Sequence, residues 1–137
     1  MIQELASRLS EKQVRRLTAG LGLSLFAFGA LPAIAPAPFG RIFGFDQITP
    51  EIASIMRSVG ARDLASGLAL WSAATHGGNF APWLLARIIS DGGDVAAIGI
   101  AAAQGARDKR FLTLGALALS ATLADTALWL LARRKQV

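Results

Sequence analysis

The stretch Ser58–Gly67, which reads SVGARDLASG, decides how this chain can fold. It places Arg62 and Asp63 side by side within a long apolar segment. A charged side chain at mid-depth in a membrane costs about 2.5–3.5 kcal/mol on insertion scales, so it pairs inside a helix bundle or lines a wet cavity. The nearby Gly60 and Gly67 would allow another helix to approach closely.

The composition favours a membrane protein. The 137 residues are 53% hydrophobic and 17% charged, which is unusually apolar for a soluble domain. The net charge is +5, but the basic residues gather at the ends of apolar runs, as anchors flanking membrane helices do, so no nucleic-acid partner is expected. The chain has no cysteine and one histidine, which argues against conventional zinc sites. We expect no metal and no cofactor.

Four apolar runs of about 20–25 residues are each long enough to cross ~30 Å of hydrocarbon. They cover residues 17–35, 50–75, 81–104 and 109–133. Residues 1–16 are polar and carry apolar side chains at helical spacing, which predicts an amphipathic helix at the membrane surface. The expected fold is all-α. It consists of a four-transmembrane-helix bundle in residues 17–137, preceded by a short amphipathic N-terminal helix in residues 1–16.

The connections and the charge distribution predict the topology. The segment PAPFGRIFGFDQ, residues 36–47, is expected to be a loop with its phenylalanines at the membrane interface. Four spans put both termini on one side, and the excess of Lys and Arg in the terminal segments favours the cytoplasm. We therefore expect a protein of the bacterial inner membrane, in contact with lipid, with a homo-oligomer left open. A cleavable secretory signal is the alternative reading of the first run.

Charged residues recur inside the expected spans. On the third run, Arg87, Asp91 and Asp94 have the i, i+4, i+7 spacing of one helix face. Counting from the helix ends places Arg62 and Asp63 level with Asp91 and Asp94, and Arg87 level with a residue of the fourth run. The full set is Arg62, Asp63, Arg87, Asp91, Asp94 and Asp125.

The charges of this set do not balance, because two arginines face four aspartates. A protonated acid, water or a bound cation would relieve the excess. A neutral acid beside a carboxylate held by arginine is suited to general acid–base catalysis. In that reading Asp91 or Asp94 is the base, its neighbour or Asp63 is the acid, and Arg62 and Arg87 orient them.

Two other readings remain open. Buried Arg–Asp pairs also hold helices together without chemistry, and they can conduct ions or protons. A bracing role is the prediction for Asp125 with Arg87. Gly92 and Gly93 weaken a helix, so they are expected either to leave room for a ligand or to let another helix come close. The leading hypothesis is an enzyme acting on a lipophilic small molecule by hydrolysis, isomerisation or cyclisation. The alternative is a non-catalytic scaffold or a small oligomeric transporter.

The motif GxRDxxxG, formed here by Gly60, Arg62, Asp63 and Gly67, resembles that of a family of small four-helix integral membrane proteins known only as a domain of unknown function. The resemblance covers about residues 39–131. It includes Phe43-Gly44 before the second run, and Asp91 or Asp94 in the third. It implies the four-helix membrane fold and an importance of Arg62 and Asp63, but it implies no activity.

Overall fold

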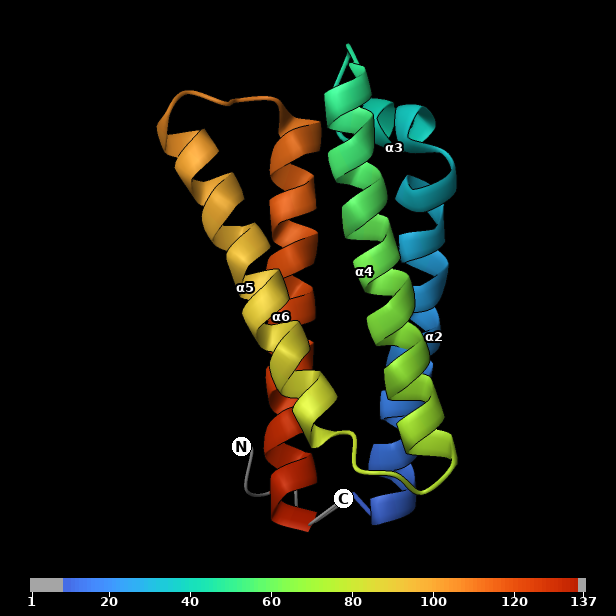
Figure 1. Ribbon diagram of the computed structural model, residues 1–137. Helices are drawn as coiled ribbons and strands as arrows, with labels where there is room; N and C mark the ends of the chain where they lie inside the picture. The colour runs from blue at the N-terminus through green and yellow to red at the C-terminus, as the bar shows by residue number, and fades with distance from the viewer. Residues whose placement is uncertain (1–8, 136–137) are drawn as a thin grey trace.

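The computed structural model describes residues 9–135, which form five α-helices and no strand (Figure 1). The long helices form two antiparallel pairs, α2 with α4 and α5 with α6, and the short α3 lies across the end of the first pair. Packing is extensive within each pair and sparse between the pairs. The helices are α2 (Glu11–Ile34), α3 (Pro36–Ile42), α4 (Pro50–Thr75), α5 (Ala81–Ala103) and α6 (Lys109–Lys135).

Local sequence signals set the helix ends. Ser10 caps α2 in a capping box with Gln13, and the Thr49 hydroxyl accepts a hydrogen bond from the backbone N–H of Ile52 at the start of α4. Beyond α4 and α5, Gly77 and Gly105 have positive φ, a conformation that glycine adopts without strain. The expected bounds of α4, α5 and α6 are confirmed to within about two residues.

The expected organisation near the N-terminus needs two corrections. Residues 11–16 begin α2 and continue directly into the apolar run, so the helix does not break at residue 16. The rest of the predicted amphipathic segment, residues 1–8, lies outside the described residues. Residues 36–42 form α3 instead of a loop, because Pro36 suits the first helical position. Phe39 and Phe43 are buried there and do not face a membrane interface.

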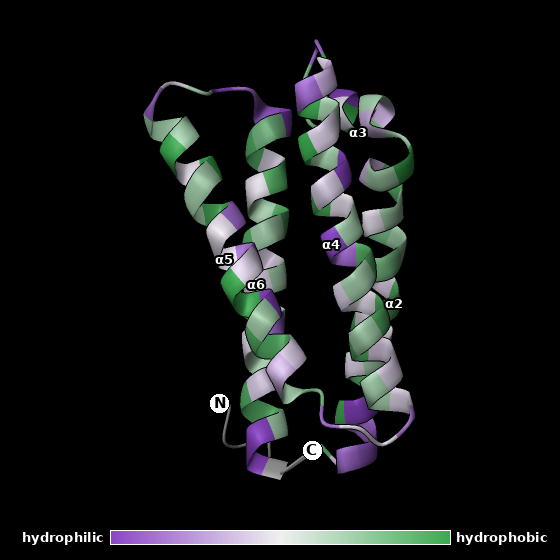
Figure 2. Ribbon diagram, viewed as in Figure 1, coloured by the Kyte–Doolittle hydropathy of each residue, from purple (hydrophilic) through white to green (hydrophobic). Residues whose placement is uncertain are grey.

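The prediction of a four-transmembrane-helix bundle is wrong. Within the described residues, two helices are long and apolar enough to cross a membrane: Glu11–Ile34 and the part of α6 from Lys109 to Arg134. The charged side chains of α4 and α5 lower their hydropathy, and Figure 2 shows hydrophilic turns at mid-height in both. Apolar length alone therefore overestimated the number of spans. By length and composition, two helices of this all-α chain could span a membrane.

Four glycines bring α2 and α4 into backbone contact, and we call this the glycine seam. Gly22 lies against Gly67, and Gly29 lies against Gly60. A Cβ on Gly60 would lie 2.5 Å from the backbone nitrogen of Ala33 and 2.6 Å from the carbonyl oxygen of Gly29. On each helix the two glycines are seven residues apart, a spacing that keeps them on the helix face that is turned to the partner helix. The expectation that Gly60 and Gly67 admit another helix closely is confirmed, and that helix is α2.

Two apolar cores lie at opposite ends of the molecule. One joins all four long helices near the described chain ends, around Val14, Leu70 and Phe80. The other lies beside α3 and consists of Phe39, Phe43 and Met56. The charged residues lie between these two cores.

Candidate functional site

Arg87 is the centre of the charged cluster and is only 2% exposed. Its Nη1 donates to Oδ1 of Asp63 on α4 at 2.7 Å, and its Nη2 donates to Oδ2 of Asp91 on α5 at 2.6 Å. Its Nε lies 3.7 Å from Oδ2 of Asp125 on α6. One guanidinium thus joins three helices and connects the two helix pairs. Such short, charge-assisted hydrogen bonds are among the strongest in proteins.

Arg62 makes a second connection between the pairs. Its Nη2 and Nη1 donate to the two carboxylate oxygens of Asp94 at 2.7 and 3.3 Å, which is a bidentate pair. Its Nε donates to Oδ1 of Asp63 at 3.1 Å. The expected contact of Arg62 with Asp91 or Asp94 is therefore confirmed, and the partner is Asp94. About a third of each side chain in this pair is exposed, so it is the wetter part of the cluster.

The predicted difference in height between Arg87 and its neighbours Asp63 and Asp91 does not hold. Arg87 was expected to lie deeper, level with Asp125 and apart from Asp63 and Asp91. In the structure it pairs with Asp63 and Asp91, and its contact with Asp125 is longer. The reason is that a long arginine side chain moves its charge well away from its own Cα, whereas counting residues locates only the Cα. The six residues form one continuous cluster.

Asp125 is the least satisfied member of the cluster. It is fully buried, and neither of its carboxylate oxygens accepts a hydrogen bond from any described residue. The Nε of Arg87, its nearest cationic atom, donates no hydrogen bond either. If all the carboxylates were ionised, the cluster would carry four negative and two positive charges. Its net charge would then be −2.

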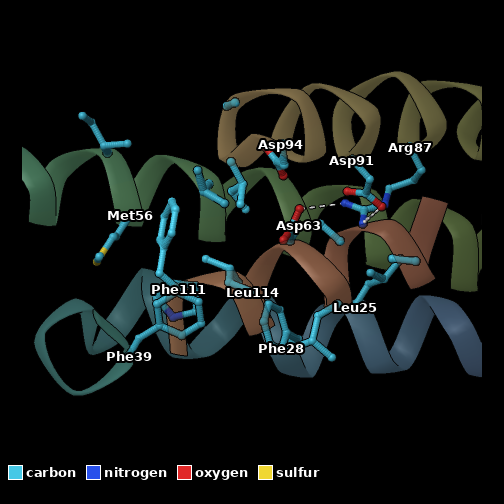
Figure 3. A pocket seen from close by; sticks show the side chains of 18 of the residues that line it. Leu25, Phe28, Phe39, Met56, Asp63, Arg87, Asp91, Asp94, Phe111 and Leu114 are labelled. Carbon is cyan, nitrogen blue, oxygen red and sulfur yellow. Dashed lines mark hydrogen bonds and ion pairs between the residues drawn. The ribbon is translucent and has the colours of Figure 1, made fainter. Parts of the chain in front are cut away.

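A cavity of about 480 Å³ opens beside this cluster, between the two helix pairs. Figure 3 shows Asp63, Arg87, Asp91 and Asp94 together at one end, with Phe39 and Phe111 toward the other. Its volume lies within the range of about 300–1,000 Å³ that is typical of small-molecule pockets. Except for Ser24 and the four charged residues, its lining is apolar: Leu25, Phe28, Pro32, Phe39, Phe45, Ile55, Met56, Val59, Ala97, Ile98, Phe111, Leu114, Leu117, Ala118 and Ala121.

The two pairs also contact each other toward the far end of the cavity. The rings of Phe45 and Phe111 meet edge to face, with centroids 5.8 Å apart. Next to them, Nη2 of Arg110 lies 3.3 Å from Oδ1 of Asp46 and 2.8 Å from Oδ2 of Asp108. Hydrogen bonds from the Arg110 side chain lower the pKa of the exposed Asp108 carboxyl below its ordinary value.

Some features of the site were missed or misplaced by sequence reasoning. Phe39 and Phe45 were assigned to the membrane interface but line the cavity, and Phe28 and Phe111, which also line it, were overlooked. Gly92 and Gly93 do not line the cavity, and a Cβ on either would meet no atom within 4 Å. Within the described structure, they therefore neither border the cavity nor admit a close helix.

Within residues 9–135, no three or more His, Asp or Glu side chains are arranged so that they could hold a metal ion. No family model, curated protein or solved structure matches the chain. The resemblance to the family of unknown function stays a prediction.

Proposed function

We propose that the protein is a small membrane enzyme that performs acid–base chemistry on a lipophilic small molecule. The observation that carries this proposal is the cavity, whose long apolar wall ends at three carboxylates and an arginine. Apolar pockets with a few converging polar groups are the usual form of small-molecule sites. Hydrolysis, isomerisation and cyclisation are the reaction classes that such a site suits.

The proposed roles follow from the contacts. Asp94 and Asp91 both border the cavity, and each is held by a different arginine. One of them removes a proton from the substrate or from water, and the other, or Asp63, returns a proton to the product. Arg62 and Arg87 fix the carboxylates in position. The excess of carboxylates over arginines supports the presence of a proton within the cluster.

The proposed location is the bacterial inner membrane, with both termini in the cytoplasm. The candidate spans in α2 and α6 run in opposite directions, which would put both chain ends on one side. The terminal segments are rich in Lys and Arg, as cytoplasmic segments are. Exposed apolar side chains on α6, such as Leu119 and Leu123, suit contact with lipid.

A bracing role is the second candidate function, because Arg87 joins α4, α5 and α6 through its carboxylate contacts. In that case the protein is a scaffold, and the cavity is a packing gap. An asparagine that keeps the shape of an aspartate would then be tolerated throughout the cluster.

The test compares Asp91→Asn and Asp94→Asn with the parent protein in lipid nanodiscs. Each is incubated with terpene epoxides and polyenes, both neutral and amine-bearing, and gas chromatography coupled to mass spectrometry follows the addition of water or the appearance of an isomer. We expect both variants to lose at least about 100-fold in turnover, the typical contribution of one acid–base group, while they remain folded. Asp46→Asn, outside the cavity, is the matched control. Turnover by both variants at the parent rate, or no turnover by the parent with any substrate, would favour the scaffold.

A further inference from the structure

The charged end of the cavity has an excess of negative charge. Three carboxylates border the cavity there, and Arg87 is the one cationic residue among the lining residues. Arg62 pairs with Asp94 without lining the cavity, and Asp125 adds a further buried carboxylate. In a medium of low dielectric constant, the repulsion among these carboxylates is strong, because Coulomb energies scale inversely with the dielectric constant.

Asp94 is the carboxylate best placed to receive a ligand. Its side chain is 36% exposed, whereas those of Asp63 and Asp91 are 8% and 5% exposed. Arg62 gives it one hydrogen bond on each oxygen, so further acceptor sites remain, because a carboxylate can accept about four. Asp94 can therefore accept hydrogen bonds from a ligand without losing its arginine.

The remaining wall suits the rest of an amphiphilic molecule. Phe28, Phe39, Phe45 and Phe111 line it together with aliphatic side chains. Aromatic faces attract cations as well as apolar groups. Among the side chains of this wall, only Ser24 could form a hydrogen bond with a second polar group of the ligand.

We propose that the cavity takes a lipophilic cation, with its amine or ammonium head at Asp94 and Asp91 and its apolar body among the phenylalanines. This inference rests on the proposed function and names the class of ligand for the same site. A singly charged head reduces the net negative charge of the cluster by one unit. A neutral head leaves the excess in place, and an anionic head increases it.

The experiment uses three probes with the same chain and different heads: dodecylammonium, dodecanol and dodecanoate. Each displaces the neutral fluorescent dye N-phenylnaphthylamine from the full-length protein in zwitterionic nanodiscs. Empty nanodiscs correct for partition into lipid. We expect dodecylammonium to displace the dye at a concentration at least about tenfold lower than dodecanol, with dodecanoate the weakest.

Charge variants provide the sharper result. Asp94→Asn should reduce the preference for the ammonium over the alcohol, and Arg62→Gln should increase it. A loss of packing alone would weaken both probes together and would not give opposite signs. Asp46→Asn, which also removes an exposed carboxylate, should leave the preference unchanged.

The outcomes separate the two proposals. Equal displacement by dodecanol and dodecylammonium, or tighter binding of dodecanoate, overturns the cationic ligand and leaves a lipophilic ligand in place. Failure of the dye and all three probes to bind overturns the proposed function as well.

Discussion

The two helix pairs contain glycine for different purposes. Between α2 and α4, the glycine seam brings two backbones into direct contact. On α5, Gly92, Gly93 and Gly99 have nothing within 4 Å of an added Cβ. The same residue type therefore fixes the distance between α2 and α4, whereas these three glycines of α5 only reduce its helix propensity. The backbones of α2 and α4 are in direct contact, whereas α5 is joined to α4 through the ion pairs Arg62–Asp94 and Arg87–Asp63.

Removal of Arg87 should have the largest effect, because this residue joins the two pairs. We expect Arg87→Met to lower the free energy of unfolding by about 3–5 kcal/mol, since it leaves buried carboxylates without their partner. Thermal or denaturant unfolding in detergent measures the change. Arg62→Met is the matched control, and its effect should be about 1 kcal/mol or less because its ion pair is partly exposed. Equal losses in both variants would mean that Arg87 has no special role in joining the pairs.

Larger side chains in the glycine seam should destabilise the protein. In Gly60→Ala the new Cβ would meet the backbone of α2, which cannot rotate away as a side chain can. We expect a loss of about 1–3 kcal/mol, the usual effect of overpacking, measured by the same unfolding experiment. An unchanged unfolding midpoint would show that α2 and α4 are farther apart than described.

The smallest expected change in the free energy of unfolding is an increase, at Gly93. Gly93→Ala adds a methyl group to an exposed helical position with open space around it. We expect a gain of about 0.5–1 kcal/mol from helix propensity. A loss of stability would instead reveal a neighbour at this face, such as a second copy of the chain.

Much of the secondary structure could be predicted from local signals. Thr49, Pro50 and the glycines after α4 and α5 define helix ends through hydrogen bonds and dihedral angles of nearby residues. The six charged residues were recognised as one group because unpaired charges are expensive in an apolar segment. For the glycine seam, close helix contact was predicted at Gly60 and Gly67, but their partners on α2 were not. The equal seven-residue spacing in both runs was a usable signal for Gly22 and Gly29.

The pairing within the cluster could not be predicted in the same way. Residue counting gives the height of a Cα, but the contact of Arg87 with Asp63 depends on side-chain length and on the tilt between helices. The number of spans was overestimated, because the length of α4 and α5 was given more weight than their charges. The cavity depends on how the two pairs sit relative to each other, which no local pattern encodes.

The glycine seam also sets the register of α4 along α2. Sliding by one residue would turn the glycines about 100° away and bring side chains onto the backbone of the partner. Sliding by a full turn would move α4 by about 5.4 Å. Either slip would carry Asp63 away from Arg87, to which it is now hydrogen-bonded at 2.7 Å. By fixing the register of α4 on α2, the four glycines thus align the charged residues of one helix pair with those of the other.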